Sequence, residues 1–68
     1  MIRELKPARW VATIDGQDKY VIEVAIDDLA ELDKLMDNTA HGSVAELIDA
    51  SGLTVYVFNE KLKEWVVI

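Results

Sequence analysis

The 68-residue chain has no cysteine, one proline and three glycines, and it has only seven basic residues against thirteen acidic ones. The absence of cysteine excludes a disulfide framework and a cysteine-ligated metal site. The formal net charge of −6 disfavours direct contact with a phosphate backbone. No apolar stretch is long enough to span a bilayer, and no basic, apolar leader opens the sequence. We therefore expect an intracellular, cytoplasmic protein with no membrane contact and no direct nucleic-acid partner.

What the sequence has in quantity is apolar residues, which make up 51% of the chain. This fraction is too high for intrinsic disorder and is enough for a packed core. A chain of this length removes only about 60% of its unfolded surface from water on folding, so it has room for one core. We expect a single domain over residues 1–68.

Two alternating segments, residues 9–14 and 19–26, are typical of strands. Their in-phase apolar residues are Trp10, Ala12 and Ile14 in the first segment and Tyr20, Ile22, Val24 and Ile26 in the second. Directly paired residues share a face of a sheet, so pairing these two sets requires an odd-length loop. We therefore predict Gly16 in a left-handed conformation beside a bulge, with Trp10 and Ile14 on the core side.

A helix of about three turns is predicted to begin at Asp28, because Asp28-Leu29-Ala30-Glu31 is typical of a capping box. Its apolar stripe is Leu29, Leu32, Leu35 and Met36. Its acidic residues, which are candidates for binding a partner, are Asp27, Asp28, Glu31, Asp33 and Asp37. A row of carboxylates can imitate a phosphate backbone and occupy a basic groove, although a solubilising outer face explains the same residues.

The C-terminal part predicts more sheet. Residues 43–50 fit either a short helix or a strand, and residues 53–58 and 64–68 predict a closing hairpin. With a five-residue loop at 59–63, the expected pairs are Val57–Trp65, Val55–Val67 and, on the other face, Tyr56–Val66. The predicted fold is α+β: a single antiparallel sheet of four to five strands (ββαβββ) with one helix packed on one face, or ββααββ if residues 43–50 are helical.

This closing hairpin is apolar on both faces, whereas one helix can cover only one face of a sheet. We therefore expect another protein to shield the uncovered face. The candidate partner-binding residues of the sheet face are Val55, Tyr56, Trp65 and Val67.

The sequence contains no recognisable pattern of catalytic residues. His41, the single histidine, stands beside Gly42 in a predicted loop without a second ligand or a nucleophile at a useful spacing. Asp33 and Asp37 have no predicted cleft to separate their pKa values. No phosphate-binding glycine pattern is present. We expect a protein that is not an enzyme, with no catalytic, cofactor-binding or metal site.

The order of elements, with His41-Gly42-Ser43-Val44, Gly52-Leu53, Tyr56 and Glu64-Trp65-Val66 in a terminal meander, resembles small phage-encoded anti-CRISPR proteins, in particular a type I-F inhibitor of two strands, one helix and three strands. The first half of the chain, from Val11-Ala12-Thr13-Ile14 to Leu29-Ala30-Glu31-Leu32, also resembles a small phage inhibitor of host RNA polymerase. The first resemblance implies a five-stranded antiparallel sheet, strand over residues 43–50, and occupation of a site on a CRISPR surveillance complex. That inhibitor relies on lysines where this chain is acidic or neutral, so no functional residue is carried over.

Together these features predict a small acidic protein-binding inhibitor, encoded by a phage or mobile element and acting in the host cytoplasm. Its expected partner is a host protein or ribonucleoprotein complex of a defence (CRISPR-type) or nucleic-acid-processing system. It would block that partner by occlusion or acidic mimicry. The alternative is a structural or assembly module that forms a homodimer through the uncovered sheet face.

Overall fold

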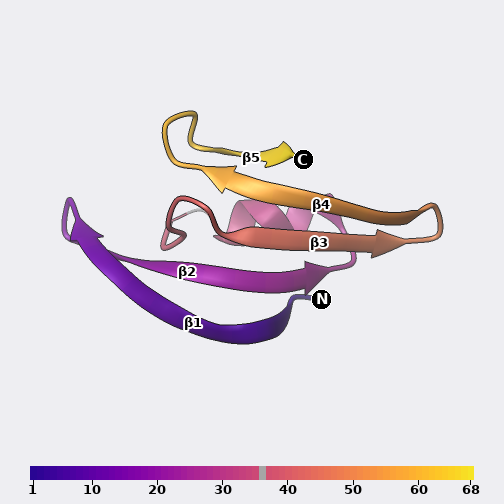
Figure 1. Cartoon of the computed structure of the whole chain (residues 1–68), viewed down its shortest axis with the longest axis horizontal. Coiled ribbons are helices and arrows are strands. Elements are labelled where there is room, and N and C mark those ends of the chain that lie inside the picture. Colours follow the sequence, from indigo (N-terminus) through magenta and orange to yellow (C-terminus); the bar gives the residue numbers. More distant parts are fainter. Residues whose placement is uncertain (36) are drawn as a thin grey trace.

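The computed structural model describes residues 1–35 and 37–68, which form a five-stranded sheet and one short helix (Figure 1). The elements are β1 (Arg3–Ile14), β2 (Gln17–Ile26), η1 (Leu29–Leu35), β3 (Val44–Asp49), β4 (Gly52–Asn59) and β5 (Glu64–Val67). The strands lie side by side in the order β1-β2-β3-β4-β5. The predicted succession of two strands, a helix and three strands is confirmed, and the ambiguous residues 43–50 contain strand β3.

The prediction of a purely antiparallel sheet is wrong at the centre of the sheet. β2 and β3 run parallel and pair Val24 with Ala45, whereas the other three ladders are antiparallel. The connection between them explains the direction. After η1 the chain returns alongside β2, where the N–H of Tyr20 donates to the carbonyl of Asn38 and the N–H of Ala40 donates to the carbonyl of Tyr20. A crossover of this kind is what parallel neighbours require.

Helix η1 is a seven-residue 3₁₀ helix, so the predicted three-turn α-helix is wrong in length and type. The N–H of Glu31 donates to the carbonyl of Asp28 at 3.0 Å, which is the i→i+3 bond of this tighter helix. The predicted capping is confirmed: the Asp28 carboxylate accepts the N–H of Ala30 at 2.9 Å, and the Glu31 carboxylate accepts the N–H of Asp27 at 3.1 Å. Because the chain rejoins β2 at Asn38, the helix has little room to continue. Met36, predicted for its apolar stripe, lies outside the described residues.

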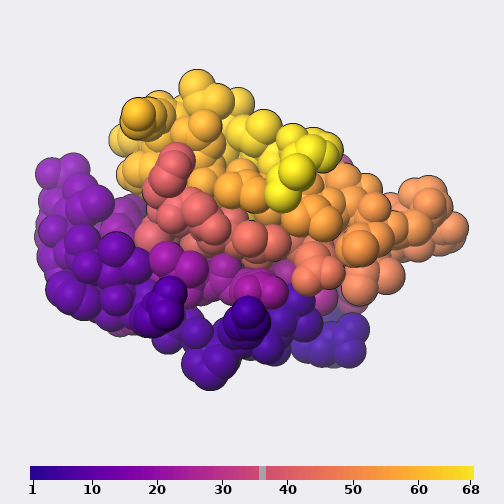
Figure 2. Space-filling view, viewed as in Figure 1, coloured from indigo at the N-terminus to yellow at the C-terminus, as the bar shows by residue number. Residues whose placement is uncertain are grey.

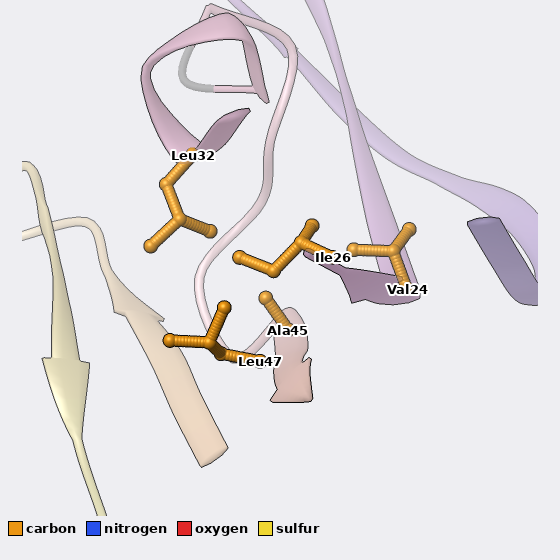
Figure 3. Packing of buried hydrophobic residues seen from close by; sticks show 5 residues of the cluster. All are labelled: Val24, Ile26, Leu32, Ala45 and Leu47. Carbon is orange, nitrogen blue, oxygen red and sulfur yellow. The ribbon is translucent and has the colours of Figure 1, made fainter. Parts of the chain in front are cut away.

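The core lies between η1 and the sheet (Figure 3). Its buried apolar residues are Val24 and Ile26 of β2, Leu32 of η1, and Ala45 and Leu47 of β3. Ile2, Ile22, Leu35, Tyr56 and Trp65 are partly buried against this cluster. Since full burial of one large aliphatic side chain contributes about 1.5–3 kcal/mol, the cluster is a main source of stability. We call the side of the sheet that carries it the helix face.

The turn between β1 and β2 is the two-residue Asp15-Gly16 turn, so the predicted odd-length loop is wrong. Both residues have positive φ, 52° and 80°, as a type I′ turn requires, and Ile14 pairs with Gln17. A register shift between Trp10 and Ala12 then pairs Trp10 with Tyr20, so these two share a face as expected. Ala12 and Ile14 pair with Lys19 and Gln17 and lie on the other face, contrary to the prediction. Trp10 and Ile14 are nevertheless exposed, and their predicted place in the core is wrong.

The closing hairpin is offset by one residue from the prediction. Its pairs are Asn59–Glu64, Phe58–Trp65, Val57–Val66 and Tyr56–Val67, so the loop has four residues, 60–63. The side chain of Asn59 explains the difference, because its Oδ1 accepts the N–H groups of Lys61 and Leu62 at 3.0 and 3.2 Å. Asn59 therefore closes the turn while remaining in the ladder.

Candidate protein-binding surface

Within residues 1–35 and 37–68, no helix or strand covers the side of the sheet opposite η1, and we call this side the open face. It is the side presented in Figures 1 and 2, with η1 behind the strands. Pairing places Val44 beside Val57, Val57 beside Val66, and Ile48 beside Leu53 on this face. Ile48, Leu53 and Val66 are 51%, 59% and 39% exposed. Contiguous apolar surface of this kind is typical of a contact site.

The open face divides into two halves. Its apolar half lies over β3, β4 and β5 and consists of Val44, Ile48, Leu53, Val55, Val57 and Val66. Its charged half lies over β1 and β2, where Arg3, Lys6 and Arg9 pair with Ala25, Glu23 and Val21. The Nζ of Lys6 lies 3.5 Å from the Glu23 carboxylate. Glu46, between Ala25 and Val55 in the sheet, marks the boundary between the halves.

The charges of the open face nearly balance. The register places four basic residues there, Arg3, Lys6, Arg9 and Lys19, and three acidic residues, Glu23, Glu46 and Glu64. The other three basic and ten acidic residues of the chain lie elsewhere, so the open face carries a formal charge of +1 and the rest of the chain −7. An incoming protein surface therefore meets little net charge on this face.

The four predicted sheet-face residues do not lie together. Val55 is on the open face, but Tyr56, Trp65 and Val67 are on the helix face. Tyr56 and Trp65 pack against the core, and the ring centroids of Trp65 and Phe58 are 5.3 Å apart. The interpretation of Tyr56 as an exposed anchor is therefore wrong.

Sequence reasoning assigned Val66 to the right hairpin but to the wrong set of neighbours. The residues that do accompany Val55 on the open face are Val44, Val57 and Val66. Asn59 is the signal that could have revealed them, because an asparagine before a turn often bonds to the following backbone N–H groups. That bonding favours the shorter loop, which reverses which residues of β5 accompany Val55.

The five predicted acidic residues differ in their contacts and in their exposure. The carboxylates of Asp27 and Glu31 both contact the amino group of Met1, that of Asp27 at 3.2 Å. The hydrogen bond from this ammonium group is the main reason that the pKa of Glu31 is lowered, and the Glu31 side chain is only 13% exposed. Asp28 caps η1. Asp33 and Asp37 are exposed. The five acids therefore do not form one exposed row.

A groove of ≈ 350 Å³ lies between β1 and β2, where the register of the ladder shifts around Pro7. Figure 2 shows an opening between these indigo and magenta segments. The groove is lined by Lys6, Pro7, Arg9, Val21, Ile22 and Glu23. Its cations and its carboxylate belong to the charged half of the open face, so the groove is part of the same surface.

At the far end of the same hairpin, Asp18 holds two β1 side chains. Its Oδ1 accepts the Thr13 hydroxyl at 2.7 Å and the Trp10 indole N–H at 3.2 Å. These hydrogen bonds, that of Thr13 first, lower the pKa of Asp18. They fix an exposed indole at the edge of the sheet.

The predicted loop position of His41 is confirmed, and its Nδ1 accepts the N–H of Glu60 at 3.1 Å. This bond ties the 41–42 turn to the β4–β5 loop. Within residues 1–35 and 37–68, no three or more histidine or acidic side chains gather as metal ligands would. In the same residues no helix has the length and apolar character to cross a membrane.

Comparisons with protein-family models, with curated proteins and with solved structures found no match to this chain.

Proposed function

We propose that the chain is a small protein-binding inhibitor and that the open face is its contact surface. The observation that carries the proposal is the apolar half of that face, where Ile48, Leu53 and Val66 are exposed although the helix face of the same sheet is covered. Removing such surface from water is favourable at about 25 cal/mol per Å². A partner that covers this half would therefore gain binding free energy from side chains that the chain itself leaves in solvent.

The kind of partner is inferred from size, charge and resemblance. The element order resembles that of small phage-encoded anti-CRISPR proteins, which supports a phage or mobile-element origin and a target in a host defence or nucleic-acid-processing complex. The target is a host protein or ribonucleoprotein met in the host cytoplasm. The protein acts by binding, without a cofactor and without catalysing a reaction.

Occlusion through the open face is favoured over acidic mimicry. Asp27 and Glu31 contact the Met1 amino group, and Asp28 caps η1, so three of the five acids serve contacts within the chain. Asp33 and Asp37 remain exposed, but two carboxylates can mimic only a short stretch of a phosphate backbone. The open face offers a broader and more continuous surface.

A phage-plating assay in cells with active type I-F CRISPR interference tests the proposal. The native chain is expected to restore plating of a targeted phage. Val66→Lys should reduce that rescue at least about tenfold, because a charge in an apolar contact costs well over 1.4 kcal/mol. Val67→Lys is the matched control: it is the next residue of β5 and is exposed, but it lies on the helix face.

Three outcomes are informative. Equal rescue by the two lysine variants would exclude the open face as the contact surface. Full rescue by the Asp33→Lys, Asp37→Lys double variant supports occlusion. Loss of rescue in that variant would instead support acidic mimicry as the mechanism. If the native chain gives no rescue, the CRISPR target is wrong, and inhibition of transcription by host RNA polymerase in vitro tests the second resemblance with the same variants.

The alternative function, a structural or assembly module, uses the same face for self-association. The exposed aliphatic side chains of that face, Ile48, Leu53 and Val66, favour it, because a second copy would remove them from water as a partner would.

A further inference from the structure

We propose that the charged half of the open face binds an acidic segment of the partner protein, whose carboxylates contact Arg3, Lys6 and Arg9 of β1. The inference rests on the proposed function, because it names the chemistry of the partner that the open face would contact. Three observations carry it: the separation of charges on this face, the lack of an ion pair at two arginines within residues 1–35 and 37–68, and the groove beside one of them.

The small net charge of the open face conceals a separation of opposite charges. All four of its basic residues lie over β1 and β2 together with one acidic residue, Glu23, which gives the charged half a formal charge of +3. Glu46 and Glu64 lie over β3 and β5, and the residues outside the charged half together carry −9. The charged half is therefore a local attraction for anions on a molecule that otherwise repels them. Its electrostatic complement is a protein segment with negative charge.

The cations of β1 are available to an external carboxylate. Within residues 1–35 and 37–68, neither Arg3 nor Arg9 forms an ion pair, and both are exposed. Lys6 lies 3.5 Å from the Glu23 carboxylate, in a solvent-exposed contact of the kind that contributes little free energy. Lys19 of β2, in contrast, already donates to a backbone carbonyl at 2.6 Å. Because a guanidinium presents paired N–H donors that match a carboxylate, the two arginines are the main contact points.

The groove of ≈ 350 Å³ between β1 and β2 gives one of these arginines a defined setting (Figure 2). Arg9 and Lys6 line it together with apolar residues that include Pro7 and Val21. Glu23, also in the lining, contacts Lys6, which leaves the Arg9 guanidinium to take a second carboxylate. A glutamate of the partner can place its carboxylate at Arg9 while its methylene groups contact the apolar lining, which removes them from water.

A protein segment suits this surface better than a nucleic-acid backbone does. The charged half adjoins the apolar half in the sheet, and a protein can carry aliphatic residues beside acidic ones, whereas a phosphate backbone would leave the aliphatic side chains in water. Binding of a nucleic acid also grows with the number of phosphates that are neutralised. β1 offers three cations on this face for that purpose, and the rest of the molecule repels phosphates.

The length of a suitable probe follows from the spacing of the cations along β1. Arg3 and Arg9 are six positions apart, at most about 20 Å of strand at about 3.3 Å per residue. An extended peptide of about seven residues covers this distance, and its alternate side chains lie on one side about 7 Å apart. The probe is the fluorescein-labelled peptide Glu-Thr-Glu-Thr-Glu-Thr-Glu. The same peptide with Gln in place of each Glu measures binding without the charges.

Fluorescence anisotropy of each peptide, titrated with the full chain, tests the inference. The acidic peptide is expected to bind at least about tenfold more tightly than the glutamine peptide, and to lose affinity as NaCl is raised from about 50 mM to about 0.5 M. Arg9→Glu should weaken binding of the acidic peptide at least about tenfold, because an attractive contact becomes a repulsive one. Lys34→Glu is the matched control: it changes the net charge equally but lies on η1, behind the sheet, and should bind as the native chain does.

Circular dichroism of each variant establishes that it is folded, and Arg3→Glu replaces Arg9→Glu if the latter does not fold. Failure of the acidic peptide to bind at about 1 mM chain overturns the inference. Equal affinity for the two peptides, or equal weakening by Arg9→Glu and Lys34→Glu, also overturns it. So does tighter binding of a labelled oligothymidylate of about seven nucleotides, which would assign these cations to a phosphate backbone.

The two proposals fail separately. If the acidic peptide does not bind and Arg9→Glu rescues phage fully, while Val66→Lys loses the rescue, the acidic segment is overturned and the inhibitor stands. If the acidic peptide binds the native chain and not Arg9→Glu, but the native chain rescues no phage, the acid-binding surface stands and the CRISPR target is overturned.

Discussion

The two faces of this sheet are built from the same kinds of residue but end in different environments. On the helix face Ile26 is 1% exposed, whereas on the open face Ile48 is 51% exposed. Both are isoleucines of central strands, β2 and β3. The difference is that Leu32 of η1 packs with Ile26, while nothing in the described chain covers Ile48. Burial here follows from the covering element and not from the strand sequence.

Burial also depends on the covering element within the helix face. Trp10 pairs with Tyr20 and so lies on that face, yet it is exposed because β1 extends past the part of the sheet that the core cluster covers. A large aromatic residue at an in-phase position is therefore not enough to extend the core. Its position relative to η1 decides whether it is buried.

The sharpest way to break the comparison of the two faces is to truncate one isoleucine on each. Ile26→Ala should lower the free energy of unfolding by about 2–5 kcal/mol, because it removes buried methyl groups and leaves a cavity. Ile48→Ala should lower it by less than about 1 kcal/mol, since its side chain is already half in solvent. Urea unfolding at low protein concentration measures both. Similar losses at the two positions would show that the open face is also covered.

A smaller effect is expected from the buried hydroxyl at the start of β3. Ser43 is 0% exposed; its Oγ donates to the carbonyl of Ala40 at 2.8 Å and accepts the N–H of Ile22 at 3.0 Å. Ser43→Ala should cost about 1–3 kcal/mol, because that partly buried N–H loses its partner. Ser51→Ala is the control, since its hydroxyl donates to Asp49 in an exposed turn. Equal destabilisation of the two variants would contradict the argument.

The smallest effect concerns Asp18, at the end of the helix face that η1 leaves uncovered. The hydrogen bond from Thr13 is the first cause of its lowered pKa, so Thr13→Val should raise that pKa toward the ordinary value. Because the folded-state pKa lies below the unfolded one, the stabilisation is present above the unfolded pKa and is lost as pH falls through the folded pKa. NMR titration of the carboxyl carbons measures the shift.

Asp49 is an internal reference in that titration. Its pKa is also lowered, in this case by Ser51, and Thr13→Val should leave it unchanged. An Asp18 titration that does not move in Thr13→Val would show that the Thr13 hydrogen bond does not hold the carboxylate in solution.

The parts of the fold that local chemistry determines could be predicted from the sequence. Period-two alternation gave β2, and the Asp28–Glu31 spacing gave the start of η1 with its capping contacts. The pairing of strands could not be predicted in the same way, because one residue more or less in a loop reverses the faces of the next strand. The Asp15-Gly16 turn has two residues where an odd number was expected, and the 60–63 loop has four where five were expected.

The candidate site shows the same limit. The existence of an uncovered apolar face follows from one short helix and a sheet that is apolar on both sides, and this expectation is confirmed in outline. Its membership depends on the register of β5, so Val55 was placed correctly while Tyr56, Trp65 and Val67 were not. The contact of Glu31 with the Met1 amino group joins residues 30 positions apart and has no local signal.

The parallel ladder between β2 and β3 also bears on the order in which the strands of the sheet pair. Each of the three antiparallel ladders joins strands separated by two or four residues, so each can close early and independently. The ladder between β2 and β3 must wait until residues 27–43 have brought two distant strands together. Since closing a longer loop costs entropy before any contact compensates for it, we expect the closure of this central junction to be the slowest step in completing the sheet.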